Sequence, residues 1–279
     1  MSTMTANGET CTACGSQRSE QLMRLKDGAY RRCSECGCIF ACPIPDNLEQ
    51  INEESFTQKL DYYGAKIHTQ RRRSRKKLSM FTPYRQTGNL LEIGCNAGAV
   101  LDVARQMGWN VQGVELCVSA SRFARERLGL DVFTGTVEAA RFPSNHFDVV
   151  YTNAVLEHLR SPLSVMRESC RILRPGGVFY ADTVNWDSYT RRLLDPRWKY
   201  LAPRSHVHLF TPANMLSLCR QAGLEHVRTW TAGVRMEAGT NGSQRCPSYW
   251  HLLKPVLSFM ARRADKGDHI RLLSRKPLR

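Results

Sequence analysis

The sequence predicts an α/β fold built on a seven-stranded, mostly parallel sheet, with a small cysteine-rich module in front of it. An apolar run that ends at residue 93 leads into a tight glycine turn and then a helical pattern, a sequence typical of nucleotide-binding sheets. Strand-like and helix-like runs then alternate along the chain, which favours parallel strands joined by helices. Six of the eleven cysteines fall in the first 42 residues, so the cysteines and the sheet belong to different parts of the chain.

The cysteine-rich module carries two Cys-x-x-Cys pairs, CTAC and CSEC, with 18 residues between them. This spacing is typical of a zinc ribbon, in which two turns each present two thiolates to a tetrahedral metal. In a reducing compartment a metal explains such closely spaced thiols better than disulfides do. We therefore expect a structural zinc ion on Cys11, Cys14, Cys33 and Cys36, with Cys38 as an alternative to Cys36.

The chain divides into three parts by composition. Residues 1–47 form the predicted zinc ribbon, which ends in the turn-rich PIPDN. Residues 48–86 have a helical and strongly basic pattern. Residues 87–279 form the α/β domain, interrupted near 185–211 by an insert rich in aromatic residues and histidines.

Within the α/β domain we expect each element from its hydrophobic period. Strands are predicted near Leu90, Val111, Val132, Val149 and Val178, and helices near Val100, Ala120 and Val165. A helix over 212–222, a strand over 225–231 and a late strand around 270–273 complete the predicted sheet of seven strands.

One acidic residue after the glycine turn indicates a ligand. The second apolar run, NVQGVEL, ends in Glu115, 23 residues after Glu92. At this spacing a carboxylate at the tip of the second strand can accept hydrogen bonds from the ribose hydroxyls of an adenosine ligand.

Four motifs follow one another in the order found in one enzyme family: LLEIGCNAG from Leu90, GVE from Gly113, FDVVYTNAVLEHL from Phe147 and RILRPGG from Arg171. They resemble the class I S-adenosylmethionine-dependent methyltransferases. The resemblance covers residues 89–253 and implies a Rossmann-like sheet and methyl transfer from S-adenosylmethionine. Two positions depart from the family pattern: Asn96 replaces a glycine of the turn, and Thr136 stands where many relatives carry an acid. Asparagine tolerates a positive φ, so the turn is expected to survive.

The resemblance assigns candidate site residues. The expected cofactor-binding residues are Glu92, Gly94, Cys95, Asn96, Gly98, Glu115, Leu116, Thr136, Val137 and Asn153. The candidate catalytic residues are His158, His206 and His208, with His158 as the first choice for a base because the pKa of histidine lies near neutral pH. Tyr62 and Tyr63 are candidates for contacts near the methionine end of the cofactor. No catalytic metal is predicted, because Ala154 stands where metal-dependent relatives carry the first acid of their site.

The net charge of +15 indicates which binding partners the chain attracts. No acid interrupts residues 62–91, and a second basic segment spans 262–279. Such patches attract anions, although a solvated helix face has the same composition. The leading hypothesis is a small-molecule acceptor of anionic character, for example a sugar, a glycan precursor or a secondary metabolite. The alternatives are an RNA methyltransferase and a catalytically silent binding module.

No run of 18 apolar residues and no signal-like leader occurs, so a soluble, cytoplasmic protein without a transmembrane segment is expected. The oligomeric state does not follow from the sequence.

Overall fold

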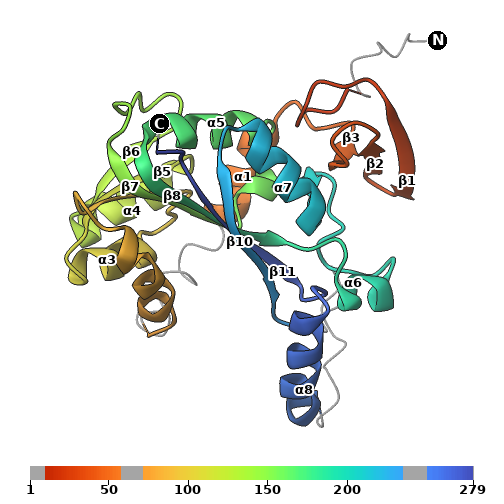
Figure 1. Cartoon of the computed structure of the whole chain (residues 1–279). Coiled ribbons are helices and arrows are strands. Elements are labelled where there is room, and N and C mark those ends of the chain that lie inside the picture. The colour runs from red at the N-terminus through yellow and green to blue at the C-terminus, as the bar shows by residue number, and fades with distance from the viewer. Residues whose placement is uncertain (1–9, 58–71, 235–249, 279) are drawn as a thin grey trace.

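A computed structural model of the chain describes residues 10–57, 72–234 and 250–278. Its centre is a seven-stranded sheet with the order β10-β11-β8-β7-β4-β5-β6 (Figure 1). The strands are β4 (Asn89–Ile93), β5 (Asn110–Glu115), β6 (Asp131–Thr134), β7 (Phe147–Asn153), β8 (Leu173–Val184), β10 (Glu225–Ala232) and β11 (His269–Arg275). Only β11 runs against its neighbours, which confirms the predicted mostly parallel sheet.

Helices cover both faces of this sheet because successive strand residues point to opposite sides. Leu90, Val149 and Val178 pack on one face against α3 (Ala99–Gln106), α4 (Val118–Leu128) and the short helix η2 (Ser79–Tyr84). The residues that follow each of them, at 91, 150 and 179, pack on the other face with α5 (Pro162–Ile172) and α7 (Pro212–Gln221). The strands and helices expected for the α/β domain are therefore confirmed.

The strand order reverses beside β4. The chain moves outward from β4 to β5 and β6, then returns to the other side of β4 as β7. At such a switch point the loops after neighbouring strands diverge and leave a crevice at their carboxyl ends. The fold therefore places its main crevice beyond β4, β5 and β7.

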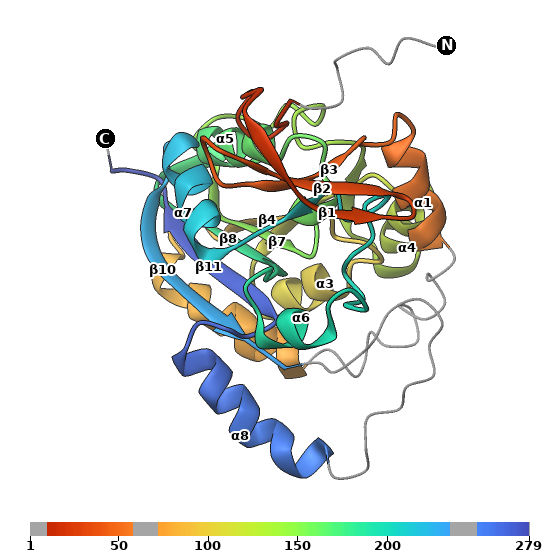
Figure 2. The same ribbon diagram turned by 90° about the vertical axis from the view of Figure 1, so that its right-hand side faces the viewer.

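The cysteine-rich module forms a second, four-stranded sheet. Three strands come from the module itself, β1 (Ser19–Leu25), β2 (Gly28–Cys33) and β3 (Ile39–Cys42). The fourth, β9 (His208–Leu209), comes from the aromatic insert and pairs with β3. A separate cluster of buried side chains joins the two, with Tyr30 and Ile39 packed with Trp198 and Leu209. The module and the insert thus share one sheet and one core (Figure 2).

The remaining elements are α1 (Leu48–Thr57), a helical stretch at 72–78, the short helix η3 (Leu156–His158), α6 (Tyr189–Leu194) and α8 (Trp250–Arg263). Among the described residues, no helix is both long enough and apolar enough to span a membrane.

Candidate functional site

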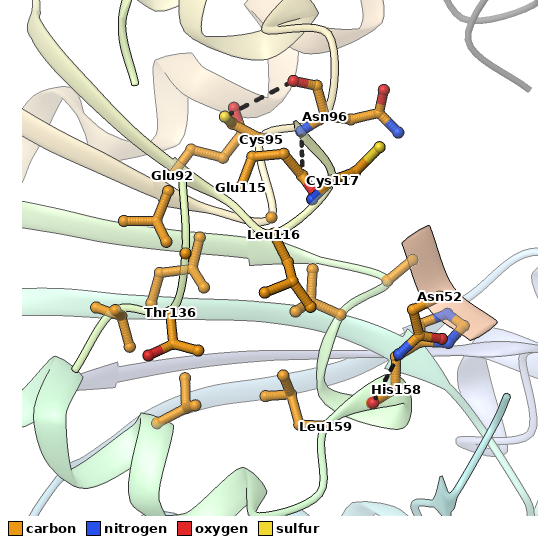
Figure 3. Close-up of a pocket in the computed structure, with 18 of the residues that line it drawn as sticks. Asn52, Glu92, Cys95, Asn96, Glu115, Leu116, Cys117, Thr136, His158 and Leu159 are labelled. Atoms are coloured by element: carbon orange, nitrogen blue, oxygen red, sulfur yellow. Dashed lines mark hydrogen bonds between the residues drawn. The ribbon is translucent and has the colours of Figure 1, made fainter. Parts of the chain in front are cut away.

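A cavity of about 410 Å³ opens at the carboxyl ends of β4, β5 and β7 (Figure 3). Its size is in the range of small-molecule sites. Nine of the ten residues expected to bind a cofactor line it, and Gly98 is the exception. Gly98 precedes α3, and a Cβ there would lie 2.4 Å from Leu130 Cδ1, so this glycine permits helix packing.

The turn after β4 requires left-handed backbone at Gly94 (φ 71°) and Asn96 (φ 50°). A Cβ on Gly94 would lie 2.3 Å from Val155 Cγ2, because the loop after β7 presses against the turn. Asn96 adopts the positive φ expected from its position, and its Oδ1 accepts a hydrogen bond from the Ala97 amide at 2.6 Å. The substitution of a glycine by Asn96 therefore leaves the turn intact.

Glu115 connects this turn to the end of β5. One carboxylate oxygen accepts the Asn96 amide at 2.7 Å, and the other accepts the Cys117 amide at 2.8 Å (Figure 3). Burial raises the pKa of this carboxyl, while the backbone amides act against the rise. Two fixed amides orient the carboxylate and leave further lone pairs for a ligand.

Glu92 is a second carboxyl in the cavity wall. Its side chain is buried, and Oε2 has no hydrogen-bond partner among the described residues. Burial raises its pKa well above the ordinary value. A buried carboxyl oxygen without a partner is costly, so this position suits a ligand that brings a donor or a positive charge.

A cluster around Asp182 adjoins the cavity. The Lys77 ammonium, from the helical stretch at 72–78, lies 3.2 Å from Asn153 Oδ1 and 3.1 Å from Asp182 Oδ2. Asp182 also accepts from His269 Nδ1 at 3.0 Å and Arg271 Nε at 2.9 Å. Burial alone would raise the pKa of Asp182, but the hydrogen bond from His269 and the surrounding cations hold it well below its usual range. Sequence reasoning treated Lys77 as one member of a basic run, and only the fold distinguishes it.

The three candidate catalytic histidines lie in different environments. His158 lines the cavity, and its Nδ1 lies 2.9 Å from the Ser205 carbonyl. His206 is not among the cavity-lining residues. Its ring lies 4.8 Å from that of His158, and its Nδ1 lies 3.0 Å from the Tyr200 carbonyl.

The environment of His208 contradicts the prediction that this residue is catalytic. The side chain is completely buried, with Nε2 2.9 Å from Thr12 Oγ1 and Nδ1 2.9 Å from the Leu159 carbonyl. Burial lowers its pKa to about 4, so the ring is neutral at physiological pH. With both ring nitrogens occupied it is a structural bridge and does not fit a catalytic base.

Cavity residues that sequence reasoning missed come from three places. Glu49, Asn52 and Glu53 lie on one face of α1, and Asn52 donates to the His158 carbonyl at 3.3 Å. Others are Glu138, just after Val137, and the segment that leads into α5, with Arg160 and Ser161 before the helix and Ser164 in its first turn. The i, i+3, i+4 spacing of the α1 residues is a signal that could have identified them. Tyr62 and Tyr63, predicted near the cofactor, lie outside the described residues.

The cysteine cluster fits a metal. The sulfur atoms of Cys11, Cys14, Cys33 and Cys36 all lie within 4.8 Å of one another. The Cys11–Cys36 and Cys14–Cys33 sulfur distances are 3.7 and 3.5 Å. Tetrahedral zinc with bonds of about 2.3 Å separates its sulfur ligands by about 3.8 Å. The geometry groups Cys36 with the other three, whereas the Cys38 sulfur lies against the Ile39 carbonyl.

One family model matches the part of the chain that forms most of the large sheet. Residues 65–229 match the family model described as "Methyltransferase domain", which is more than half of the chain. The chain belongs to this methyltransferase family. The matched residues contain the cavity turn and the ends of β5 and β7, and they leave out the cysteine module.

Curated relatives of this chain include two bacterial proteins named ubiquinone biosynthesis O-methyltransferase. The chain is 32% identical to that of Ruegeria pomeroyi over 149 residues, which cover 50% of this chain and 60% of the relative. It is 30% identical to that of Thiobacillus denitrificans over 148 residues, 49% of this chain and 64% of the relative. The chain thus matches less than two thirds of the length of either relative.

Solved structures share its fold. An S-adenosylmethionine-dependent methyltransferase from Thermotoga maritima superimposes with a TM-score of 0.56 and 19% identity, over 79% of this chain and 98% of the other. One from Archaeoglobus fulgidus gives a TM-score of 0.54 and 16% identity, over 77% and 99%. At these identities the likeness concerns the fold of the chain alone.

Proposed function

We propose that the chain transfers a methyl group from S-adenosylmethionine to a hydroxyl of a small-molecule acceptor. The observation that carries the proposal is the cavity at the strand switch point, where the glycine turn, Glu92 and Glu115 meet. The names of the relatives, O-methyltransferases, support oxygen as the acceptor atom. Nothing in the relatives' names supports the sugar or glycan expected from the sequence, so only the coarser class, a small molecule, is kept.

The cavity residues suit the parts of this cofactor. Glu115 would accept hydrogen bonds from the ribose hydroxyls, and Thr136 and Val137 would meet the adenine. Glu92, with its unpartnered oxygen, would face the positive charge of the amino acid end or the sulfonium. S-adenosylmethionine supplies a methyl carbon activated by a sulfonium, so the protein mainly aligns the acceptor and removes its proton.

His158 is the proposed base for that proton. The Ser205 carbonyl beside Nδ1 favours the tautomer with hydrogen on Nδ1, which leaves the lone pair on Nε2. Asn52 holds the backbone of the same residue at its carbonyl. The four cysteines of the module are proposed to hold a structural zinc ion, whose closed ligand set would not activate water.

Fewer observations support the two alternative functions, an RNA acceptor and a catalytically silent binding module. An RNA acceptor is supported by the net charge of +15 and by the order of a cysteine-rich module followed by a basic segment, but not by the relatives' names. The silent-module alternative rested on Asn96 and Thr136, and the intact turn at Asn96 removes half of that argument.

Titration calorimetry with S-adenosylhomocysteine tests the proposal. Glu115→Ala should weaken binding at least tenfold, because it removes a buried acceptor that also orders the turn. Glu126→Ala, an exposed change on α4, is the matched control and should bind normally. Failure of the unaltered protein to bind would contradict the proposal and favour the silent module, and equal affinity in both variants would remove Glu115 from the site.

A further inference from the structure

The helix α8 presents an apolar face to solvent. It stands apart from the main body of the molecule (Figures 1 and 2). Five large apolar side chains on it are between 36% and 59% exposed: Leu253, Val256, Leu257, Phe259 and Met260. The residues at 253, 256, 257 and 260 follow the i, i+3, i+4, i+7 pattern, so they form one stripe along the helix.

This stripe is not the core face of α8. Among the side chains described on the helix, only Ala261 is buried, and α8 contacts the sheet at β10. Single exposed apolar residues are common on protein surfaces, but a contiguous stripe of this kind marks an interaction surface. We therefore expect another molecule to cover the apolar stripe of α8.

The charged residues of α8 indicate what kind of partner binds the stripe. Lys254, Arg262 and Arg263 are the charged residues of the helix, and its sequence contains no acid. On a helical projection Lys254 and Arg263 lie on the two sides of the stripe, whereas Arg262 lies on the opposite face, and the Arg263 guanidinium lies 6.0 Å from the Phe259 ring centre. An apolar stripe flanked by basic residues is the pattern of a helix that lies flat in an anionic lipid interface.

We propose that α8 binds the surface of an anionic membrane, with its apolar stripe inserted among the lipid headgroups and its basic residues paired with phosphates. The helix leads into β11, whose His269 pairs with Val184 at the carboxyl end of β8. At the same edge of the sheet, Asn153 of β7 pairs with Asp182 of β8, and Asn153 also lines the cavity. Attachment through α8 would bring the cavity edge of the sheet toward the lipid.

Sedimentation of the full chain with lipid vesicles tests this inference without any acceptor. Binding is expected to equimolar phosphatidylcholine–phosphatidylglycerol vesicles, with weaker binding to phosphatidylcholine alone. The double variant Val256→Ser, Met260→Ser should bind the mixed vesicles about tenfold more weakly, because it removes two inserted side chains. Leu278→Ser is the matched control, since that side chain is exposed near Gly176 at the other end of β11, and it should leave binding unchanged.

Charge is tested separately. Lys254→Glu, an exposed change at the side of the stripe, should weaken binding to the mixed vesicles and reduce its sensitivity to salt, whereas Arg127→Glu, an exposed change on α4, should do neither. Failure of the unaltered chain to sediment with the mixed vesicles would overturn the inference. So would equal binding by the double variant, which would assign the attraction to other basic residues. A dimer seen by light scattering and lost in the double variant, without vesicle binding, would identify a second copy of the chain as the occupant and also overturn it.

Discussion

Among the glycines that the structure describes, Gly94 has the least room for a Cβ atom. Its φ of 71° is left-handed, and Val155 occupies the space that a side chain would need. Its neighbour Asn96 shares the left-handed backbone but has room for its side chain, which hydrogen-bonds to the Ala97 amide. At position 94 the turn needs glycine because a side chain would not fit. At position 96 it needs only a residue that tolerates a positive φ.

Gly94→Ala should therefore destabilise the protein by more than the backbone strain of about 1–2 kcal/mol, because it adds a steric clash. Gly233→Ala is the control, since Gly233 has a similar φ of 79° and nothing within 4 Å of the added Cβ. Urea unfolding measures both. A further change, Val155→Ala, should restore part of the loss, and equal costs at the two glycines would show that the clash is relieved by movement of the loop.

Between elements, His208 connects the cysteine module to the cavity. Its ring joins Thr12, between the first pair of cysteines, to the carbonyl of Leu159 in the cavity wall. Arg160, the next residue of that wall, donates to the Pro45 carbonyl at 2.7 Å. Two consecutive residues of the cavity loop are thus connected to the N-terminal part of the chain, Leu159 through the His208 ring and Arg160 directly.

His208→Phe keeps the buried volume but leaves a hydroxyl and a carbonyl without partners. We expect a loss of about 2–4 kcal/mol in the free energy of unfolding and weaker binding of S-adenosylhomocysteine, because the cavity loop loses a support. His226→Phe, in an exposed position on β10, should change neither quantity. Unfolding in urea and calorimetry provide the two readouts, and unchanged affinity in a destabilised variant would limit His208 to a role in folding.

Metal removal should disturb the module and the insert together, because β9 is part of the module's sheet. A small sheet held by four thiolates depends on its metal for folding. After chelation we expect hydrogen exchange to accelerate in β1, β2, β3 and β9, with much smaller changes in β4 and β5. Unchanged protection after confirmed loss of metal would show that the shared core alone maintains the module.

Across the whole molecule, Asp148 joins segments that are distant in the chain. It is fully buried and accepts backbone amides of Gln86, Thr87 and Gly88 at 2.9, 2.9 and 2.7 Å. It also pairs with Arg174 at the start of β8. Burial acts to raise the pKa of Asp148, but the hydrogen bonds from Arg174 and the backbone amides outweigh it, so the pKa is lowered.

Asp148→Asn should cost about 3–5 kcal/mol at neutral pH, because the Arg174 charge loses its partner. Since the folded pKa of Asp148 is below the unfolded value, its contribution is complete above about pH 4 and is lost as the pH falls through the folded pKa. The variant should therefore show a flatter dependence of stability on pH in this acidic range. Asp131→Asn, at an exposed position on β6, serves as the control in urea unfolding. A cost at Asp148 no larger than at Asp131 would contradict this account.

The sequence by itself determined the parts that depend on local spacing. Hydrophobic periods predicted the strands and helices of the large sheet, and short motifs predicted the glycine turn, Glu115 and the four grouped cysteines. Such features can be read locally because each depends on residues within one or two elements. Only the tertiary structure decided the pairing of β9 with β3, the burial of His208 and the position of Lys77 beside Asp182. Thr12 and His208 are 196 residues apart, and Lys77 and Asp182 are 105 apart. Contacts over such separations arise from the packing of whole elements, which gives one lysine or histidine a buried partner and leaves similar residues in solvent.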